Sequence, residues 1–245
     1  MKLRVSFLGA KGGIGKTTIA LHTAFYLSRK FRVLYIDKDL LSLGSLIMGF
    51  NGAGLYKAVM ENLGKEEYEY KVRDNFVILK MFSNPLDEKT FNYVLKNKAE
   101  QLIKAYVDVV SKNYDVILVD YGLVSSLRDP LFFNEYEMFI NNFKEYEMTA
   151  IGISDAIIEN IYAALDYFNR LMNEISVKPL AFIINMVPQE SRERITQIVN
   201  ELKKRVNIEV FLVPFKDEYV QYKNLDKSTD FEDIFKFIEF KLLRE

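Results

Sequence analysis

Cysteine is absent from this 245-residue chain, and histidine occurs only once. Without cysteine the chain has no disulfide bond, no thiolate zinc site, no cysteine-ligated iron–sulfur cluster and no cysteine nucleophile. The single histidine, His22, lies in a predicted helix beside Leu21 and Ala24. A lone helical histidine is more often a packing or surface residue than a catalyst. The chemistry of the protein must therefore rest on other side chains.

The net charge of the chain is small, and its uninterrupted apolar segments are short. The chain has 33 basic and 34 acidic residues and a net charge of −1, which gives no global sign of a nucleic-acid partner but leaves a local basic patch open. No segment approaches the ~18 consecutive apolar residues of a membrane span. The apolar N-terminal stretch is too short for a signal peptide. We expect a cytoplasmic globular protein, with 49% hydrophobic and 27% charged residues.

Short apolar runs alternate with longer amphipathic segments, and no repeat, low-complexity tract or Gly/Ser/Pro linker interrupts them. We therefore expect one domain over residues 1–245. The apolar runs are rich in β-branched residues, as strands buried on both faces are. The predicted strands are Leu3–Leu8, Val33–Ile36, Val77–Leu79, Val116–Val119, Thr149–Ile153, Leu180–Ile184 and Val210–Val213.

Helical periodicity fills the segments between the strands. Apolar residues recur at three- and four-residue steps in Asp87–Lys112, Asp155–Asn173 and Ser191–Arg205, and Asp155 is placed to cap the second of these helices. Strands that alternate with helices over this length predict an α/β fold, a doubly wound, mostly parallel sheet with helices on both faces. The ligand of such a sheet binds at the carboxyl ends of its strands.

A glycine-rich loop directly follows the first predicted strand. Gly9 and the sequence Gly15-Lys16-Thr17 match G-x-x-x-x-G-K-[ST], the phosphate-binding loop of P-loop NTPases. Glycines let successive backbone N–H groups turn toward phosphate oxygens, and the helix that follows presents its positive end to the same phosphates. Lys16 is placed for the β- and γ-phosphates, and the Thr17 hydroxyl for Mg²⁺. The predicted nucleotide-binding residues of the loop are Gly12, Gly13, Ile14, Gly15, Lys16, Thr17 and Thr18.

The narrower pattern K-G-G-x-G-K-[ST], from Lys11 to Thr18, resembles the deviant Walker A motif of the ParA/MinD family of ATPases. The resemblance implies that Lys11 reaches across a dimer interface to the nucleotide of the other subunit, and hence that ATP drives homodimerisation. Charge-assisted hydrogen bonds to phosphate are strong enough to do so. The alternative for Lys11 is a solvated loop lysine.

Two further strands resemble motifs of the same family. Val33–Asp39 ends in D-x-D, and the resemblance implies that Asp39 orients or activates the attacking water while Asp37 lies near the loop and the metal. Both acids could instead be helix caps or solvated turn residues. Tyr114–Asp120 resembles a Walker B strand, in which Asp120 would hold Mg²⁺ through a water. Lys11, Lys16 and Asp39 are thus the candidate catalytic residues, and Thr17 and Asp120 the candidate metal site.

Two late segments extend the resemblance to the base of the nucleotide. Phe182–Asn185 is similar to the strand whose terminal asparagine, here Asn185, reads adenine. Val213–Asp217 is similar to the Pro-containing loop at the base, which places Pro214 there. ATP and Mg²⁺ are accordingly the expected cofactors.

The sequence departs from the family after Asp120, where Gly122 can match one glycine of the γ-phosphate switch but Val124 replaces the last one. The aromatic segment 125–147 can form either a core-packing helix or a dimer or partner surface. The C-terminal stretch Phe231–Leu243 can form either a packed helix or a membrane-surface helix.

The resemblance implies an ATPase whose ATP-dependent homodimer, together with a protein activator, positions or segregates a cellular cargo. Other functions remain open. A DNA segregator would need a basic cluster, for which the candidates are Arg192, Arg194, Lys203, Lys204 and Arg205. A membrane localiser would use the C-terminal helix, and a small-molecule synthetase would need a substrate pocket. The protein would then lie in the cytoplasm, at the membrane surface or at the nucleoid. Cysteine-dependent metal-cluster relatives are excluded.

Overall fold

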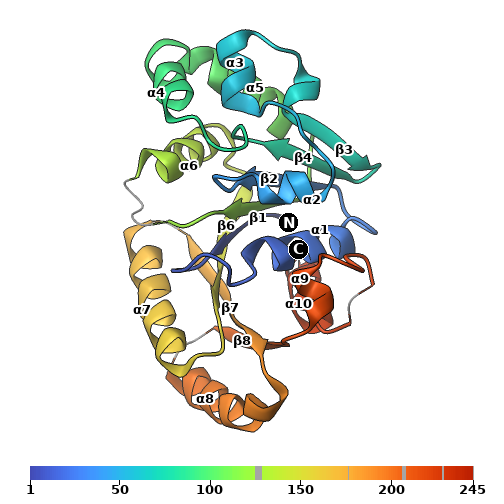
Figure 1. Cartoon of the computed structure of the whole chain (residues 1–245), viewed down its shortest axis with the longest axis vertical. Coiled ribbons are helices and arrows are strands. Elements are labelled where there is room, and N and C mark those ends of the chain that lie inside the picture. The colour runs from blue at the N-terminus through green and yellow to red at the C-terminus, as the bar shows by residue number, and fades with distance from the viewer. Residues whose placement is uncertain (125–128, 176, 206–207, 228, 245) are drawn as a thin grey trace.

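The computed structural model describes residues 1–124, 129–175, 177–205, 208–227 and 229–244, without the side chains of Arg205 and Val220. Eight strands form one sheet in the order β3-β4-β2-β5-β1-β6-β7-β8 (Figure 1). All neighbouring pairs are parallel except β3 and β4. The strands are β1 Lys2–Leu8, β2 Val33–Lys38, β3 Glu69–Arg73, β4 Phe76–Lys80, β5 Val116–Tyr121, β6 Tyr146–Ser154, β7 Lys178–Val187 and β8 Glu209–Pro214. The predicted fold class and all seven predicted strands are confirmed.

The strand that the sequence pattern missed, β3, lies at the edge of the sheet. Its sequence Glu-Tyr-Lys-Val-Arg is mostly polar, and its residues are partly or fully exposed. The pairing of β3 with β4 shifts register between Lys71 and Arg73. Charged residues and irregular pairing are common on edge strands, because they discourage pairing with another chain. Such a strand lacks the apolar run by which the buried strands are recognised.

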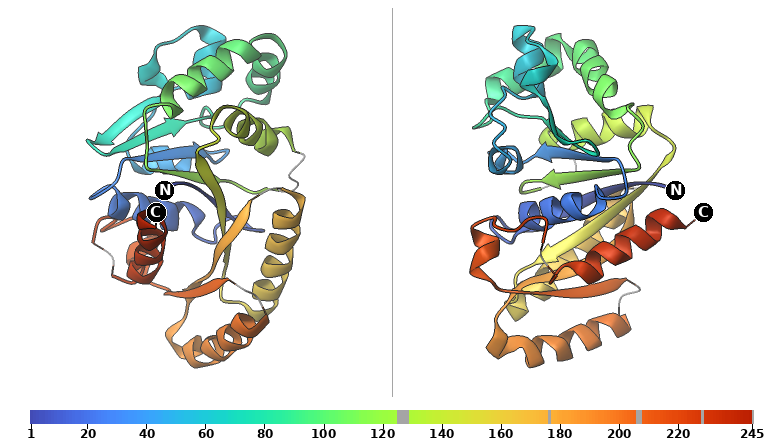
Figure 2. Two further views of the ribbon diagram at one scale, coloured as in Figure 1. Left: turned by 180° about the vertical axis from the view of Figure 1, so that it is seen from behind. Right: turned by 90° about the vertical axis from the view of Figure 1, so that its right-hand side faces the viewer.

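Helices cover both faces of the sheet (Figure 2). One face packs against α1 (Lys16–Leu27) and the C-terminal helix α10 (Glu232–Leu243), and its core includes Val5, Ile19 and Phe235. The core on the opposite face includes side chains from several longer helices. These are α3 (Leu55–Glu61), α4 (Glu88–Asn97), α5 (Ala99–Val110), α6 (Pro130–Asn142), α7 (Ile158–Glu174) and α8 (Arg192–Arg205). Two short helices, α2 (Leu43–Ile47) and α9 (Asp217–Val220), flank the carboxyl ends of the strands.

The predicted helical segment Asp87–Lys112 is helical, but it is divided into two helices. The segment forms α4 and α5, which are separated at Lys98, a residue with a non-helical φ of −134°. The Lys98 ammonium donates hydrogen bonds of 2.9 Å to the carbonyls of Val59 and Met60 in α3. A cation that binds the last carbonyls of another helix is favourable, because those carbonyls lack partners within their own helix. This tertiary contact accompanies the break that periodicity alone did not reveal.

The cap predicted at Asp155 also needs correction. Helix α7 begins at Ile158, and its first flanking residue, Ile157, makes no side-chain cap bond. The Asp155 carboxylate accepts the backbone N–H of Ile157 at 3.2 Å and both of its oxygens accept the Asn160 amide. Asp155 therefore lies before the helix and orders the turn that leads into it.

The two aromatic segments pack into the core. In the described part of the segment 125–147, helix α6 begins at Pro130. The preceding residue, Asp129, caps the helix, since its side chain accepts the N–H of Leu131. The buried aromatic residues of this segment are Phe132, Tyr136, Phe139, Phe143 and Tyr146. Residues 125–128 lie outside the described residues. In α10 the apolar stripe is also buried, and Phe240 and Leu243 are exposed. The packing alternative holds for both helices. The described helices include none that could cross a bilayer.

Candidate functional site

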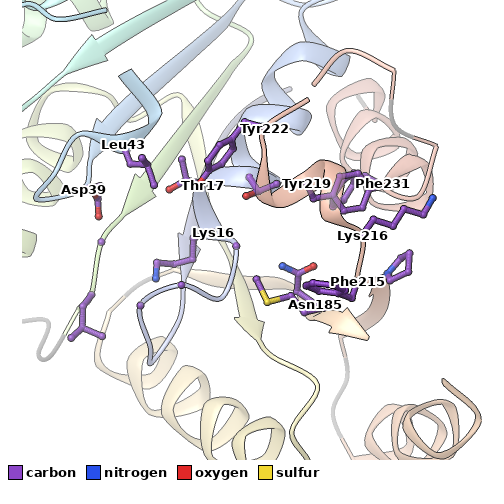
Figure 3. A pocket seen from close by; sticks show the side chains of 18 residues that line it. Lys16, Thr17, Asp39, Leu43, Asn185, Phe215, Lys216, Tyr219, Tyr222 and Phe231 are labelled. Atoms are coloured by element: carbon purple, nitrogen blue, oxygen red, sulfur yellow. The ribbon is translucent and has the colours of Figure 1, made fainter. Parts of the chain in front are cut away.

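A cavity of about 230 Å³ opens at the carboxyl ends of the strands. Most of the predicted binding residues line it, and Figure 3 shows Lys16, Thr17, Asp39 and Asn185 arranged around it. Segments far apart in the chain meet there because parallel strands place their carboxyl ends at one edge of the sheet. The lining residues from the predictions are Gly12, Gly13, Gly15, Lys16, Thr17, Thr18, Asp39, Asn185 and Pro214.

The glycine loop turns tightly between β1 and α1. Gly13 and Gly15 have φ values of +74° and +88°, a region that side chains other than glycine rarely adopt. A Cβ on Gly15 would lie 2.2 Å from the Asn185 side-chain nitrogen, so that position also needs glycine for space. Ile14 contributes its backbone to the loop, and its side chain is buried in the core. The loop thus leaves its backbone free to face a ligand.

Lys16 is the cation inside the cavity. Its ammonium donates a 2.9 Å hydrogen bond to the Lys11 carbonyl, and the residue is only 7% exposed. Burial lowers the pKa of Lys16, while the nearby carboxylates of Asp120 and Asp39 act to raise it. A buried ammonium held by a single carbonyl has further donors to offer to an anion.

Asp37 and Asp120 lie side by side at the ends of β2 and β5, paired in the strand register. Burial raises the pKa of Asp120 to about 7, and the neighbouring charge of Asp37 adds to the rise. Burial likewise raises the pKa of Asp37 to about 6, although that carboxylate accepts both the Ser45 N–H and the Ser45 hydroxyl at 2.6 Å. Asp37 therefore contacts α2 and does not line the cavity.

The candidate metal site rests on Asp120 and Thr17. One Asp120 oxygen accepts the Tyr35 hydroxyl at 2.8 Å, and the other is buried with no hydrogen-bond partner of normal geometry among the described residues. The Thr17 side chain also interacts with the Asp120 carboxylate, so the two predicted metal-site residues lie together. A carboxylate beside a hydroxyl fits a place that holds a hydrated Mg²⁺. The described residues contain no cluster of three or more carboxylate or histidine ligands. Mg²⁺ suits such a place, because it usually takes its other ligands from phosphates and water.

Asp39 is half-buried at the cavity wall, next to the loop after β5. Its carboxylate accepts the N–H of Leu41 at 3.0 Å. A Cβ on Gly122 would lie 3.0 Å from the other Asp39 oxygen, so glycine lets the two loops approach closely. Val124, which replaces an expected glycine, is buried, and its carbonyl accepts the Tyr167 hydroxyl. Val124, where the family pattern has a glycine, thus packs into the core.

Asn185 lies across the cavity from Asp39 (Figure 3), and Pro214 also lines the cavity. Asn185 is 6% exposed, and its amide nitrogen donates to the Ile14 carbonyl at 2.8 Å. This bond fixes the amide orientation against the glycine loop and leaves the carbonyl oxygen as an acceptor. Phe215 and Lys216, from the predicted loop Val213–Asp217, also line the cavity. Sequence reasoning did not identify the remaining lining residues as ligands, and these are Leu43, Leu123, Met186, Tyr219, Tyr222 and Phe231.

Lys11 is the one predicted catalytic residue that does not line the cavity. Its side chain is 53% exposed, and its ammonium lies 3.7 Å from the Asp155 carboxylate. A pair this exposed contributes little to stability, because water and salt screen it. Lys11 and Lys16 therefore belong to one loop but differ in environment, because the Lys11 side chain is exposed beside Asp155 and Lys16 is buried within the cavity.

Residues 5–227 match the family described as the CobQ/CobB/MinD/ParA nucleotide binding domain. The chain belongs to this family. The family membership expected from the loop motif is thereby confirmed. An uncharacterized ATP-binding protein of Methanocaldococcus jannaschii is 24% identical over 192 residues, with 71% of each chain covered.

Two solved structures show the same fold over nearly the whole chain. A putative plasmid partition protein from Borrelia burgdorferi, bound to AMPPNP, has a TM-score of 0.67 at 16% identity, with 99% of this chain and 98% of that chain covered. The septum site-determining protein MinD of Pyrococcus horikoshii, complexed with Mg-ADP, has a TM-score of 0.64 at 19% identity, with 98% and 96% covered. At these identities the likeness establishes the fold.

Proposed function

We propose that the protein binds ATP with Mg²⁺, forms a homodimer when ATP is bound, and hydrolyses the ATP to end that state, and that this cycle positions or segregates a cellular cargo. The observation that carries the proposal is the division between the two lysines of the glycine loop. Lys16 is buried inside the cavity, where one subunit can use it, and the Lys11 side chain is exposed and does not line the cavity. An exposed cation beside a phosphate site suits a second copy of the chain.

Each polar group of the cavity has a defined task in this proposal. The loop N–H groups and Lys16 bind the phosphates, and Asn185 offers its carbonyl oxygen to the amino group of adenine. Bound Mg²⁺ would neutralise phosphate charge, with Thr17 and Asp120 as the residues that hold it. Asp39, at the cavity wall near Gly122, orients the attacking water and accepts its proton.

The comparisons support a nucleotide-driven cycle. One structural neighbour is a septum site-determining protein bound to Mg-ADP, and another is a putative plasmid partition protein bound to AMPPNP. Both names refer to placing or partitioning a cellular structure. The same class of task, with a different cargo, is the function that we propose for this chain.

We propose a protein activator as the partner, in preference to a membrane or DNA. In α10 the apolar stripe is buried, so a membrane-binding face is reduced to Phe240 and Leu243. In α8 the basic candidates Arg192, Arg194, Lys203 and Lys204 are interspersed with the acids Glu193 and Glu201, and Lys203 pairs with Glu209. Neither helix presents a strong membrane or DNA surface.

The decisive experiment measures assembly in an Asp39→Ala background, which blocks turnover. With ATP and Mg²⁺, analytical ultracentrifugation should show a dimer, and with ADP a monomer. Lys11→Ala in that background should bind ATP but stay monomeric, since loss of one charge partner in a buried interface costs about 2–5 kcal/mol. Lys16→Ala should lose nucleotide binding altogether.

Asp155→Ala is the matched control for Lys11→Ala. It removes the carboxylate that pairs with Lys11 within one chain but keeps the lysine. If Lys11 acts only through that pair, both variants should behave alike. A normal ATP-dependent dimer of the Lys11→Ala protein would refute the role of Lys11 across the interface, and unchanged ATP binding by Lys16→Ala would refute the nucleotide site.

A further inference from the structure

Tyr222 occupies a backbone position that normally belongs to glycine. It follows the short helix α9, and its φ is +52°. The Lys223 N–H bonds to the Glu218 carbonyl at 3.0 Å, and the Tyr222 N–H bonds to the Tyr219 carbonyl at 3.3 Å. These two bonds form the Schellman motif, in which the left-handed residue is usually glycine and sometimes asparagine. A tyrosine there is conformationally unfavourable, so its side chain needs another explanation.

The side chain of Tyr222 lines the nucleotide cavity, beside Thr17 and Tyr219 (Figure 3). Its hydroxyl interacts with the hydroxyl of Thr18, in the first turn of α1. Burial raises the pKa of Tyr222, and the carboxylates of Asp120 and Asp39 contribute to the rise. The hydroxyl is therefore protonated at neutral pH and available as a hydrogen-bond donor.

Unfavourable backbone conformations gather around this cavity. Among the described residues, those other than glycine and asparagine with positive φ are Ser42, Met186 and Tyr222. Met186 and Tyr222 line the cavity, and Ser42 precedes Leu43, which also lines it. Strained residues of this kind cluster at binding and catalytic sites, where the side chain's task outweighs the backbone cost.

The position of Tyr222 along a bound nucleotide follows from its neighbours. In the proposed binding mode, Lys16 contacts the β- and γ-phosphates and Asn185 contacts the adenine base, and both residues line the cavity. Thr18 follows Thr17 in the turn whose N–H groups face the phosphate chain, which leaves the α-phosphate as the group within its reach. The Tyr222 hydroxyl, beside that of Thr18, points to the same group.

We propose that Tyr222 is a nucleotide-binding residue whose hydroxyl donates a hydrogen bond to the α-phosphate while its ring covers the adjoining ribose. This inference rests on the proposed binding of ATP. It assigns the segment after α9, which carries no phosphate-binding motif, to the part of the nucleotide that ADP and ATP share. Loss of the hydroxyl should therefore weaken the binding of ADP and of ATP by the same factor.

Isothermal titration with Mg-ADP and Mg-ATP tests the assignment, with turnover of ATP blocked by Asp39→Ala. Tyr222→Phe should lower the affinity for both nucleotides roughly tenfold, because it removes one hydrogen bond to a charged group. Tyr222→Gly should lower both affinities at least as much. The matched control is Asn224→Gly, which alters the neighbouring positive-φ residue, φ +55°, that does not line the cavity. It should keep affinity within about twofold, since it loses no proposed ligand contact.

Thermal melting separates binding from folding. Tyr222→Gly should melt at or above the wild-type temperature without nucleotide, because glycine favours the left-handed position. Wild-type affinity in both Tyr222 variants would overturn the assignment. Loss of affinity in Tyr222→Gly without loss in Tyr222→Phe would overturn the role of the hydroxyl. Failure of the wild-type protein itself to bind either nucleotide would instead refute the proposed function.

Discussion

Two buried polar clusters lie on opposite faces of the same two strands. Consecutive strand residues point to opposite sides of a sheet. Asp37 and Asp120 therefore face the glycine loop and α2, while their successors Lys38 and Tyr121 face α6. On the α6 side, Arg4 and Tyr121 donate to one oxygen of Glu135 at 2.7 and 2.6 Å.

In the cluster under α6 buried charges of opposite sign adjoin, whereas Asp37 and Asp120, behind the glycine loop, carry like charges. Tyr106 donates to the second Glu135 oxygen, and Lys38 donates to the Phe132 carbonyl at 2.9 Å. Burial acts to raise the pKa of Glu135, but the charges of Arg4 and Lys38 outweigh it and lower the pKa. In the pair of Asp37 and Asp120, burial raises the pKa of Asp120 to about 7, and the like charge of Asp37 adds to the rise. Opposite charges placed together stabilise the fold, and like charges placed together indicate a site for an external cation.

The largest expected effect comes from breaking the cluster under α6. Glu135→Ala leaves Arg4 buried without its carboxylate, so the free energy of unfolding should fall by about 3–5 kcal/mol. Urea denaturation measures this loss. The double variant Arg4→Met, Glu135→Leu should recover most of it, because no unpaired charge remains. A loss below about 1 kcal/mol in the single variant would show that the cluster is not structural.

His22 tests burial as the main cause of a pKa shift, because the charges of Glu218 and Asp226 only partly oppose it. It is fully buried between Phe231 and Tyr219, and its ring nitrogens have no partner of normal hydrogen-bond geometry among the described residues. Burial lowers its pKa from 6.5 to about 4. Between these two pKa values the unfolded state binds a proton at His22 and the folded state does not. The contribution of neutral, buried His22 to the free energy of unfolding is therefore fully present above pH 6.5 and is lost as the pH falls toward 4. The loss should reach on the order of 3 kcal/mol.

Because His22 is the sole histidine, its NMR titration reports this pKa directly. The matched denaturation series is wild type against His22→Leu, whose stability should fall less steeply with acid. A measured pKa near 6.5 would contradict the buried, neutral state of the imidazole.

The smallest expected effect on stability comes from a substitution of Asp120, in the pair of like charges. Asp120→Asn removes a buried charge that faces Asp37, so at pH 8 without metal the protein should be as stable as wild type or more stable by about 1 kcal/mol. The same variant should lose most of the Mg²⁺ dependence of ADP binding. Denaturation in EDTA and titration with and without Mg²⁺ measure the two effects. A clear loss of stability would place Asp120 in the structural class with Glu135.

Much of the fold could be predicted from the sequence because its signals are local. Continuous apolar runs marked the seven buried strands, and the spacing of Gly9, Lys11 and Lys16 indicated the glycine loop and the family. Strand ends gave the positions of Asp39, Asp120 and Asn185, since every parallel strand presents its carboxyl end to one edge. These inferences need only neighbouring residues and the rule of parallel topology.

Tertiary structure alone decided the rest, because the deciding contacts join residues distant in the chain. Arg4 meets Glu135 across 131 positions, and no periodicity marks that pair. Lys98 breaks a regular helical pattern by binding α3, and Tyr222 reaches the glycine loop from a turn with no motif. Local sequence fixes which residues can form strands, helices and a phosphate loop. The balance of burial and charge around each side chain depends on what the folded chain brings beside it.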